Sequence, residues 1–131
     1  MSLLLLDTTF LIDAERGGVD LDDAIDDDDD VAIAAVTVAE LLVGVKLVSG
    51  RQRKARQAYV DEIIESLPII AYDLDVAIEH ADLLVAVRET GRPRGAHDLL
   101  IAATARATNR NVVTADQPAF ADLPRVAVGH R

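Results

Sequence analysis

The chain has 131 residues, which suits one domain able to bury about two thirds of its unfolded surface in a single core. Half of the residues are apolar and none is cysteine, which excludes a disordered chain, disulfides, thiolate metal sites and cysteine nucleophiles. A net charge of −10 counts against nucleic-acid binding if the charge is spread evenly over the surface.

The charge is concentrated in one segment. Residues 20–30, "DLDDAIDDDDD", hold eight aspartates and no basic residue, so the rest of the chain carries only −2. The basic residues cluster in "RQRKAR" (51–56) and "RETGRPRG" (88–95). Local cationic patches are therefore compatible with a chain that is acidic in sum.

The chain opens on "MSLLLL", in which four leucines without a basic flank predict a buried strand and no signal peptide. No run approaches the roughly 18 apolar residues that a membrane span needs. We therefore expect a cytoplasmic protein that makes no membrane contact.

Five short segments predict strands. Each is aliphatic without polar alternation, which is typical of strands covered on both faces. They are residues 3–6, 31–36, 68–72, 111–114 and 125–128.

The segments between these strands predict helices, because they carry apolar residues at helical spacing or end on glycine. They are residues 8–18, 37–48, 51–67, 73–91 and 97–109. Alternating strands and helices predict one α/β domain over residues 1–131, a parallel sheet of order 3-2-1-4-5 with helices on both faces. In such sheets ligands bind beyond the carboxyl ends of the strands, where the strand order reverses.

Two acids lie in the first half of the chain at positions that favour either a structural or a functional role. Asp7 ends the first strand, where it would cap the next helix or ligate a metal; taken alone, the cap is favoured. Thr37 and Glu40 have the spacing of a capping box. Glu40 also lies along the apolar stripe of its helix, where an unpaired carboxylate is costly, so both interpretations stay open.

Two further acids lie in the second half. Asp98, in "HDLLIAATARA", would gain from the helix dipole, but it points toward the buried side of its helix, which favours a ligand role. Asp116, in "VVTADQPAF", is by itself an ordinary turn acid. If strands one and four are neighbours, Asp7 and Asp116 flank one crevice.

Four carboxylates in one cleft raise each other's pKa unless a divalent cation neutralises them. Ligation by oxygen alone selects Mg²⁺ or Mn²⁺ over zinc. The set of acids therefore predicts phosphate chemistry.

Four stretches in this order resemble the PIN-domain ribonucleases and, among them, the VapC toxins of bacterial toxin–antitoxin pairs: "LLLLDTTFLID", "VTVAELLVGV", "HDLLIAATA" and "VVTADQPAF". The resemblance covers essentially the whole chain and implies a parallel sheet between helices. It implies that Asp7, Glu40, Asp98 and Asp116 are catalytic and hold the metal, with Thr114 as a polar helper of the last. His97 stands where family members vary, and no role is assigned to it.

The resemblance also implies an activity and partners. These are Mg²⁺-dependent cleavage of structured RNA such as tRNA or rRNA, restraint by a cognate VapB-type antitoxin, and a homodimer. One or two Mg²⁺ ions, held chiefly by Asp7 and Asp98, would activate a water for in-line displacement. The arginine clusters would hold the RNA, because the chain has only two Tyr and two Phe for base stacking. The apolar faces of 37–48 and 51–67 are candidate interfaces, although burial in the core would explain them equally well.

Three alternatives compete with this interpretation. The first is a PIN-like RNA- or protein-binding module whose acids are structural caps. The second, a phosphoryl-transfer enzyme, ranks low because "DTT" stands in place of "DxD" and both lysines, Lys46 and Lys54, come early. The third, a dinucleotide-binding domain, lacks its Gly-rich turn.

The aspartate run within 20–30 lacks the Gly and Glu of a calcium loop. Leu21 and Ile25, four residues apart, predict one short amphipathic helical turn with aspartates on its solvent side. We expect the run to bind no catalytic metal, to set the net charge and to keep RNA off its face.

Overall fold

The computed structural model describes residues 1–18 and 20–129, and its centre is a four-stranded parallel sheet. The strands are β1 (Leu3–Leu6), β2 (Asp30–Ala34), β3 (Ile69–Ile70) and β4 (Asn111–Val113), in the order β3-β2-β1-β4. All three strand pairs are parallel. The predicted parallel sheet and its strand order are confirmed.

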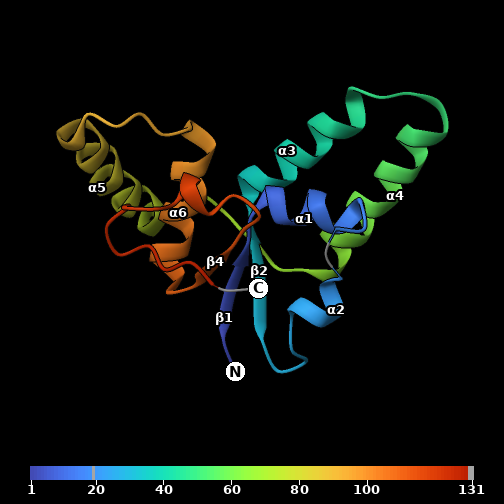
Figure 1. The fold of residues 1–131 in the computed structure, drawn as a ribbon, viewed down its shortest axis with the longest axis horizontal. Coiled ribbons are helices and arrows are strands. Elements are labelled where there is room, and N and C mark those ends of the chain that lie inside the picture. The colour runs from blue at the N-terminus through green and yellow to red at the C-terminus, as the bar shows by residue number, and fades with distance from the viewer. Residues whose placement is uncertain (19, 130–131) are drawn as a thin grey trace.

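Helices connect the strands and rise beyond them as two arms (Figure 1). They are α1 (Thr8–Glu15), α2 (Leu21–Ala24), α3 (Ala35–Lys46), α4 (Gly50–Ser66), α5 (Leu74–Thr90), α6 (Ala96–Thr108) and the 3₁₀-helix η1 (Gln117–Ala119). One arm contains α3 and α4, and the other contains α5 and α6. Among the residues described, no helix combines the length and apolarity that crossing a bilayer requires.

Apart from Asp30 and Asn111 at the starts of β2 and β4, the strand residues are aliphatic, which suits a sheet covered on both faces. Leu4 and Leu6 of β1 pack into the core formed with α1, α3 and α4. Leu5, between them, packs into a second core with α5 and α6. Successive side chains of a strand point to opposite faces, so the unbroken leucine run serves both cores.

The fifth predicted strand is reduced to one bridge. Of 125–128, only Val128 pairs with the sheet, through a parallel bridge to Val112 beside β4. Pro124 precedes the segment, and Arg125 adopts a left-handed φ of 57°. This turn breaks the extended backbone, so the prediction of a full strand is wrong, although the segment lies at the predicted edge of the sheet.

The bounds of the second and third strands also differ from the prediction. The second strand was expected over 31–36, but it ends at Ala34 and α3 begins at Ala35. A buried apolar run does not show where a strand becomes a helix. The third strand is only Ile69–Ile70, following Pro68, which has no backbone N–H to donate.

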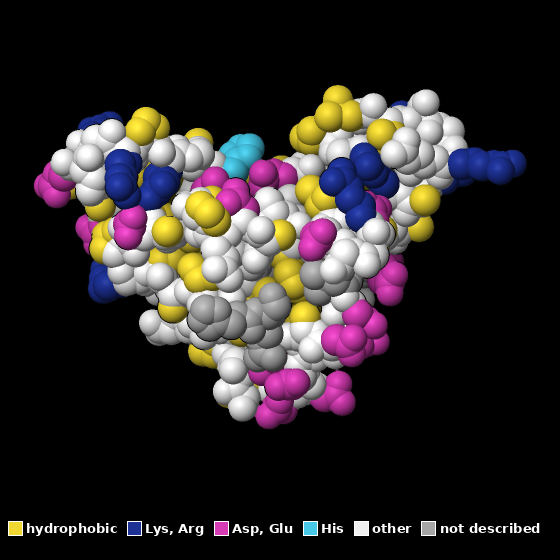
Figure 2. All heavy atoms as spheres, in the orientation of Figure 1, with side chains coloured by type: hydrophobic (Ala, Val, Ile, Leu, Met, Phe, Trp, Pro, Cys, Tyr) yellow, Lys and Arg dark blue, Asp and Glu magenta, His cyan; other side chains and the backbone are white. Residues whose placement is uncertain are grey.

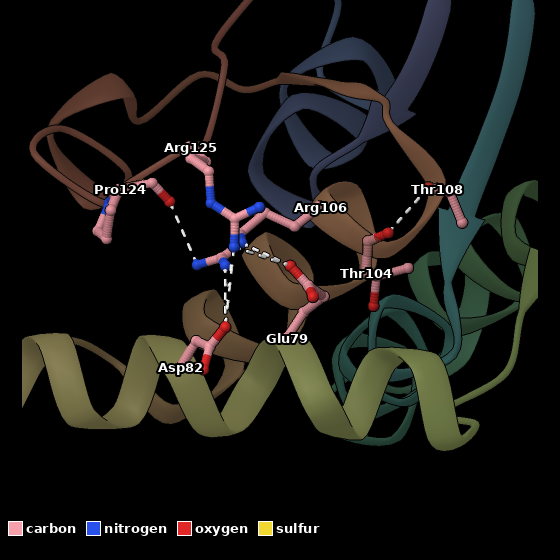
Figure 3. A network of polar contacts seen from close by, with 7 residues as sticks. All are labelled: Glu79, Asp82, Thr104, Arg106, Thr108, Pro124 and Arg125. Atoms are coloured by element: carbon pink, nitrogen blue, oxygen red, sulfur yellow. Dashed lines mark hydrogen bonds and ion pairs between the residues drawn. The ribbon is translucent and has the colours of Figure 1, made fainter.

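A buried arginine joins the two helices of one arm (Figure 3). The Arg106 side chain is 3% exposed; its Nε donates to Glu79 Oε1 at 3.0 Å, and its Nη2 lies 3.4 Å from Asp82 Oδ2. Its Nη1 donates to the Pro124 carbonyl at 3.3 Å. Arg106 therefore fixes α6 against α5 and against the C-terminal segment.

Replacing Arg106 with Met should destabilise the fold, because Glu79 would keep its charge with only the longer contact, 3.4 Å, to the exposed Arg125. We expect the free energy of unfolding in urea to fall by about 3 kcal/mol. The matched control is Arg92→Met, which removes an exposed ion pair to Asp122 whose side chains are 66% and 71% exposed. That variant should lose less than about 1 kcal/mol. Equal losses in the two variants would contradict the assigned role of Arg106.

Candidate functional site

The site is built where β1 and β4 end side by side. The Asp7 backbone N–H donates to the Val113 carbonyl at 2.8 Å, so the residue after β1 lies beside the end of β4. From β1 the chain continues toward β2 on one side, whereas β4 lies on the other. This reversal of strand order leaves a crevice at the carboxyl edge of a parallel sheet.

Asp7 directly follows β1 at this edge of the sheet, and it is buried, with 1% of its surface exposed. It occupies the N-cap position of α1, but its side chain makes no capping hydrogen bond. Instead, Oδ2 accepts hydrogen bonds from Thr9 Oγ1 at 2.6 Å and from Thr114 Oγ1 at 2.7 Å. Within 1–18 and 20–129, no hydrogen bond reaches Oδ1, so this oxygen is available to a ligand.

Glu40 projects from α3 toward the same edge. The helix begins at Ala35, so Thr37 lies inside it and the capping-box interpretation is wrong. Glu40 Oε1 instead accepts a 2.7 Å hydrogen bond from Thr8 Oγ1, which also lies 3.1 Å from Thr37 Oγ1. Its other oxygen, Oε2, lies 3.3 Å from His97 Nδ1.

Asp98 lies in the first turn of α6, against the glycine that precedes the helix. A Cβ at Gly95 would lie 2.9 Å from Asp98 Oδ2, so glycine leaves room for the carboxylate. Because a substituent there would push on Asp98, the position of this side chain depends on Gly95.

The electrostatics of Asp98 show that the acids are close to one another. Burial raises the pKa of its carboxyl above the usual range, and Asp7, Glu40 and Asp116 raise it further. His97 lowers that pKa. Acids affect each other in this way only when they share one poorly screened region.

Asp116 completes the group from the segment after β4. It is exposed and precedes η1, and its side chain makes no capping hydrogen bond. Its backbone N–H donates to Thr114 Oγ1 at 2.9 Å. Thr114 is 5% exposed and thus joins Asp7 to the Asp116 backbone. The structure therefore brings the four acids and Thr114 to one edge of the sheet.

Sequence reasoning missed three polar residues of the site: Thr8, Thr9 and His97. Thr8 and Thr9 directly follow Asp7, and they donate to different acids, Glu40 and Asp7. Thr9 Oγ1 also accepts the Ala115 N–H at 3.2 Å, from the segment after β4. In the sequence, Thr8 and Thr9 directly after Asp7 at the end of a strand could have indicated that hydroxyl groups hold the acids of the site.

The donor set fits a hard divalent cation. The free ligands are carboxylate oxygens, which suit Mg²⁺ or Mn²⁺ and not zinc. Asp7 Oδ1 is one of them, and the Asp98 carboxylate accepts no hydrogen bond from the residues that the structure describes. A cation would also relieve the repulsion that raises the pKa of Asp98.

A second acidic cluster lies at the other end of the sheet. Oxygens of Asp26, Asp28 and Asp29 lie within 4.8 Å of one another, as a cation site would require. Asp29 accepts the Ser2 N–H at 3.0 Å and the Asp26 N–H at 2.9 Å, so it fixes this loop. Asp30 pairs with Leu3 at the start of β1, whereas the candidate site follows the end of β1. The second cluster and the candidate site therefore lie at opposite ends of this strand.

A cavity of about 140 Å³ opens beside Glu40, between α1, α3 and α4. Its lining residues are Ile12, Glu15, Arg16, Glu40, Leu41, Gly44, Arg56, Tyr59 and Val60. Burial, then the charges of Glu15 and Glu62, raise the pKa of Tyr59 to about 12. Tyr59 stays protonated and donates to the Leu11 carbonyl at 2.7 Å, which fixes α4 against α1.

Charged side chains are arranged around the notch between the arms (Figure 2). Acidic side chains and a histidine lie in the notch, and basic side chains lie on both arms. The far tip of the molecule, below the sheet, is acidic. The negative charge of the chain is therefore not uniform over this face.

Comparison with known proteins identifies several similar sequences. Residues 4–126 match the model of the PIN domain. Over 123 residues, the chain is 35% identical to Ribonuclease VapC5 of Mycobacterium tuberculosis, covering 94% of this chain and 89% of the relative. It is 28% identical to a Ribonuclease VapC of Rickettsia bellii over 126 residues, covering 95% and 93%.

Solved structures agree with this likeness. The VapBC-5 toxin–antitoxin complex of Mycobacterium tuberculosis contains a chain that matches with a TM-score of 0.79 at 33% identity, covering 97% of this chain and 94% of the other. A chain of VapBC2 from Rickettsia felis, bound to a promoter DNA fragment, matches with a TM-score of 0.85 at 24% identity, covering 97% of each. The second likeness establishes the fold alone.

Replacing Asp98 with Asn should stabilise the metal-free protein at pH 7. The raised pKa of Asp98 means that folding opposes its ionisation, so the wild type is penalised at pH values above that pKa. The difference in melting temperature should shrink as the pH falls, because protonation neutralises Asp98 itself. Melts in EDTA at pH 7 and pH 4 measure both effects.

The control for this comparison is Asp27→Asn, which removes the same charge from the exposed run and should raise the melting temperature less. A variant Asp98→Asn that melts below the wild type at pH 7 would contradict the proposed repulsion and favour a structural role for the acid.

Proposed function

The chain belongs to the PIN domain family, and from this premise we propose that it is a Mg²⁺-dependent endoribonuclease of the VapC type. The observation that carries the proposal is the gathering of Asp7, Glu40, Asp98 and Asp116 where β1 and β4 end. The names of the relatives, Ribonuclease VapC5 and Ribonuclease VapC, support the same chemistry.

Asp7 and Asp98 would hold the metal, with Glu40 and Asp116 completing the set of catalytic acids. Bound Mg²⁺, or Mn²⁺ in its place, supplies an activated water and neutralises charge on the scissile phosphate. The hydroxyls of Thr9 and Thr114 hold Asp7 Oδ2, and Oδ1 accepts no hydrogen bond from the described residues. Thr114 thus contacts the side chain of Asp7, whereas it contacts only the backbone of Asp116.

RNA would lie across the notch, with its phosphates on the two arms. Arg51, Arg53 and Lys54 are exposed on α4, and Arg88 and Arg92 are exposed on the other arm. Guanidinium groups suit phosphate contacts, and the small number of aromatic side chains argues against extensive base stacking. We propose a structured RNA, tRNA or rRNA, as the substrate.

We further propose a cytoplasmic protein, a cognate VapB-type antitoxin and a homodimer. Solved relatives are toxin–antitoxin complexes, which supports the antitoxin. Of the candidate interfaces, α4 buries Val60 and Ile63 in the core, so burial accounts for its apolar face. By contrast, Val43 of α3 and Leu47, which follows the helix, are 54% and 79% exposed.

The alternative of a non-catalytic module with structural caps loses its main support. Asp7 and Asp116 occupy N-cap positions, yet neither side chain makes a capping hydrogen bond. Glu40 lies well inside α3 and is held by Thr8. The absence of these caps supports a role for the three acids other than helix capping.

Cleavage of RNA in Mg²⁺ should be abolished by Asp7→Asn and by Asp98→Asn, because each removes a proposed metal ligand. EDTA should also abolish it, and added Mg²⁺ should restore it. The matched control is the double variant Asp27→Asn, Asp28→Asn, which removes exposed carboxylates at the opposite end of the sheet and should cleave nearly as the wild type does. A gel or fluorescence assay on a structured RNA measures each rate.

Activity that survives both substitutions, or that resists EDTA, would contradict the site. A large loss in the double variant would show that the acidic run takes part in the reaction.

Light scattering on the purified chain should give a mass near twice that of one 14.1 kDa chain. Co-expression with its antitoxin should give a larger complex in which RNA cleavage is lost. A monomer at micromolar concentration would contradict the homodimer, and full activity in the complex would contradict restraint by the antitoxin.

A further inference from the structure

His97 is the one histidine described at this edge of the sheet, and the family-like motifs assign it no role. It lies in the first turn of α6, directly before Asp98, and its side chain is 59% exposed. Its Nδ1 lies 3.3 Å from Glu40 Oε2, on α3. The contact therefore joins the two arms across the notch.

Glu40 differs from the other acids in the way it is held. Thr8 Oγ1 donates to its Oε1 at 2.7 Å, and His97 approaches its Oε2. Asp7, in contrast, has one carboxylate oxygen without a hydrogen bond in the described part of the chain. Both oxygens of Glu40 thus have polar partners, from α1 and from α6.

A glutamate needs this restraint more than an aspartate does. Its side chain has one more rotatable bond, and the Glu40 side chain is 28% exposed, so packing alone does not fix its carboxylate. The hydroxyl of Thr8 fixes one oxygen and leaves the carboxylate free to turn about that contact. A second contact on Oε2 removes this freedom.

We propose that His97 is a positioning residue of the metal site, which holds the Glu40 carboxylate from α6 while Thr8 holds it from α1. The inference rests on the proposed nuclease function and adds a residue to its site. His97 acts through Glu40 and touches neither the metal nor the RNA. Residues that orient metal ligands in this way commonly contribute about 10- to 100-fold to metal affinity or activity.

The test compares His97→Ala, His97→Asn and the control His80→Ala. His80 is a histidine on α5 whose Nδ1 lies 2.9 Å from the Tyr72 hydroxyl, so its removal deletes a comparable polar contact elsewhere. Calorimetric titration of the metal-free protein with Mn²⁺ gives metal affinity without reference to activity, and steady-state cleavage of an RNA oligonucleotide gives kcat and KM.

We expect His97→Ala to weaken Mn²⁺ binding and lower kcat by about tenfold or more, with KM for RNA unchanged. His97→Asn, whose amide nitrogen replaces Nδ1, should recover most of the loss. His80→Ala should match the wild type. Because the His97 side chain is exposed, its variants should have the same melting temperature as the wild type.

A double-mutant cycle with Glu40→Gln decides whether His97 acts through Glu40. In that background, removing His97 should change neither Mn²⁺ affinity nor kcat any further. An undiminished loss in that background, or a change confined to KM, would overturn the proposal and indicate direct contact with RNA. His97→Ala that binds Mn²⁺ and cleaves as the wild type does would also overturn it. A wild type that neither binds Mn²⁺ nor cleaves RNA would instead refute the proposed function.

Discussion

Asp7, Glu40 and Asp116 repel the partly buried Asp98 carboxylate at the carboxyl edge of the sheet, and folding has to overcome that repulsion. The effect is visible in the raised pKa of Asp98, to which burial contributes most and the three other acids add. The opposing free energy comes from the two cores on either face of the sheet, which bury the aliphatic strands. The site is therefore a local cost in stability that the hydrophobic layers offset.

Threonine hydroxyl groups hold two of the acids, Asp7 and Glu40. A lysine or arginine would neutralise a carboxylate and compete with a cation, whereas a threonine fixes one oxygen without cancelling the charge. Thr9 and Thr114 both donate to Oδ2 of Asp7, and its Oδ1 accepts no hydrogen bond from the described residues. In this respect the neutral partners of the acids matter as much as the acids themselves.

The sequence predicts the fold well because the aliphatic strands and their alternation with helices are strong signals. It fails where one apolar run spans two elements, as at Ala34 and Ala35, and where a left-handed residue such as Arg125 interrupts an extended segment. Both depend on local backbone geometry, which periodicity does not encode.

The acids of the site could be selected from their positions after strands and on buried helical faces. Their partners could not. Thr8 bonds to Glu40, 32 residues away, and Thr9 lies beside Thr114, 105 residues away. The first pair follows from β1 lying beside β2, which leads into α3, and the second from β1 lying beside β4; spacing along the chain reveals neither.

The distribution of charge explains how an acidic chain can suit a polyanion. Eight aspartates lie in residues 20–30, and the last of them pairs with the amino end of β1, whereas the candidate site lies beyond its carboxyl end. The basic clusters lie on the two arms beside the notch (Figure 2). Charges farther apart than about 8–10 Å are largely screened at physiological salt, and the four-residue strand β1 separates the run from the candidate site, so the run acts only weakly there. In the proposed function, the acidic run would disfavour RNA at the opposite end of the molecule and would have little effect on RNA at the notch.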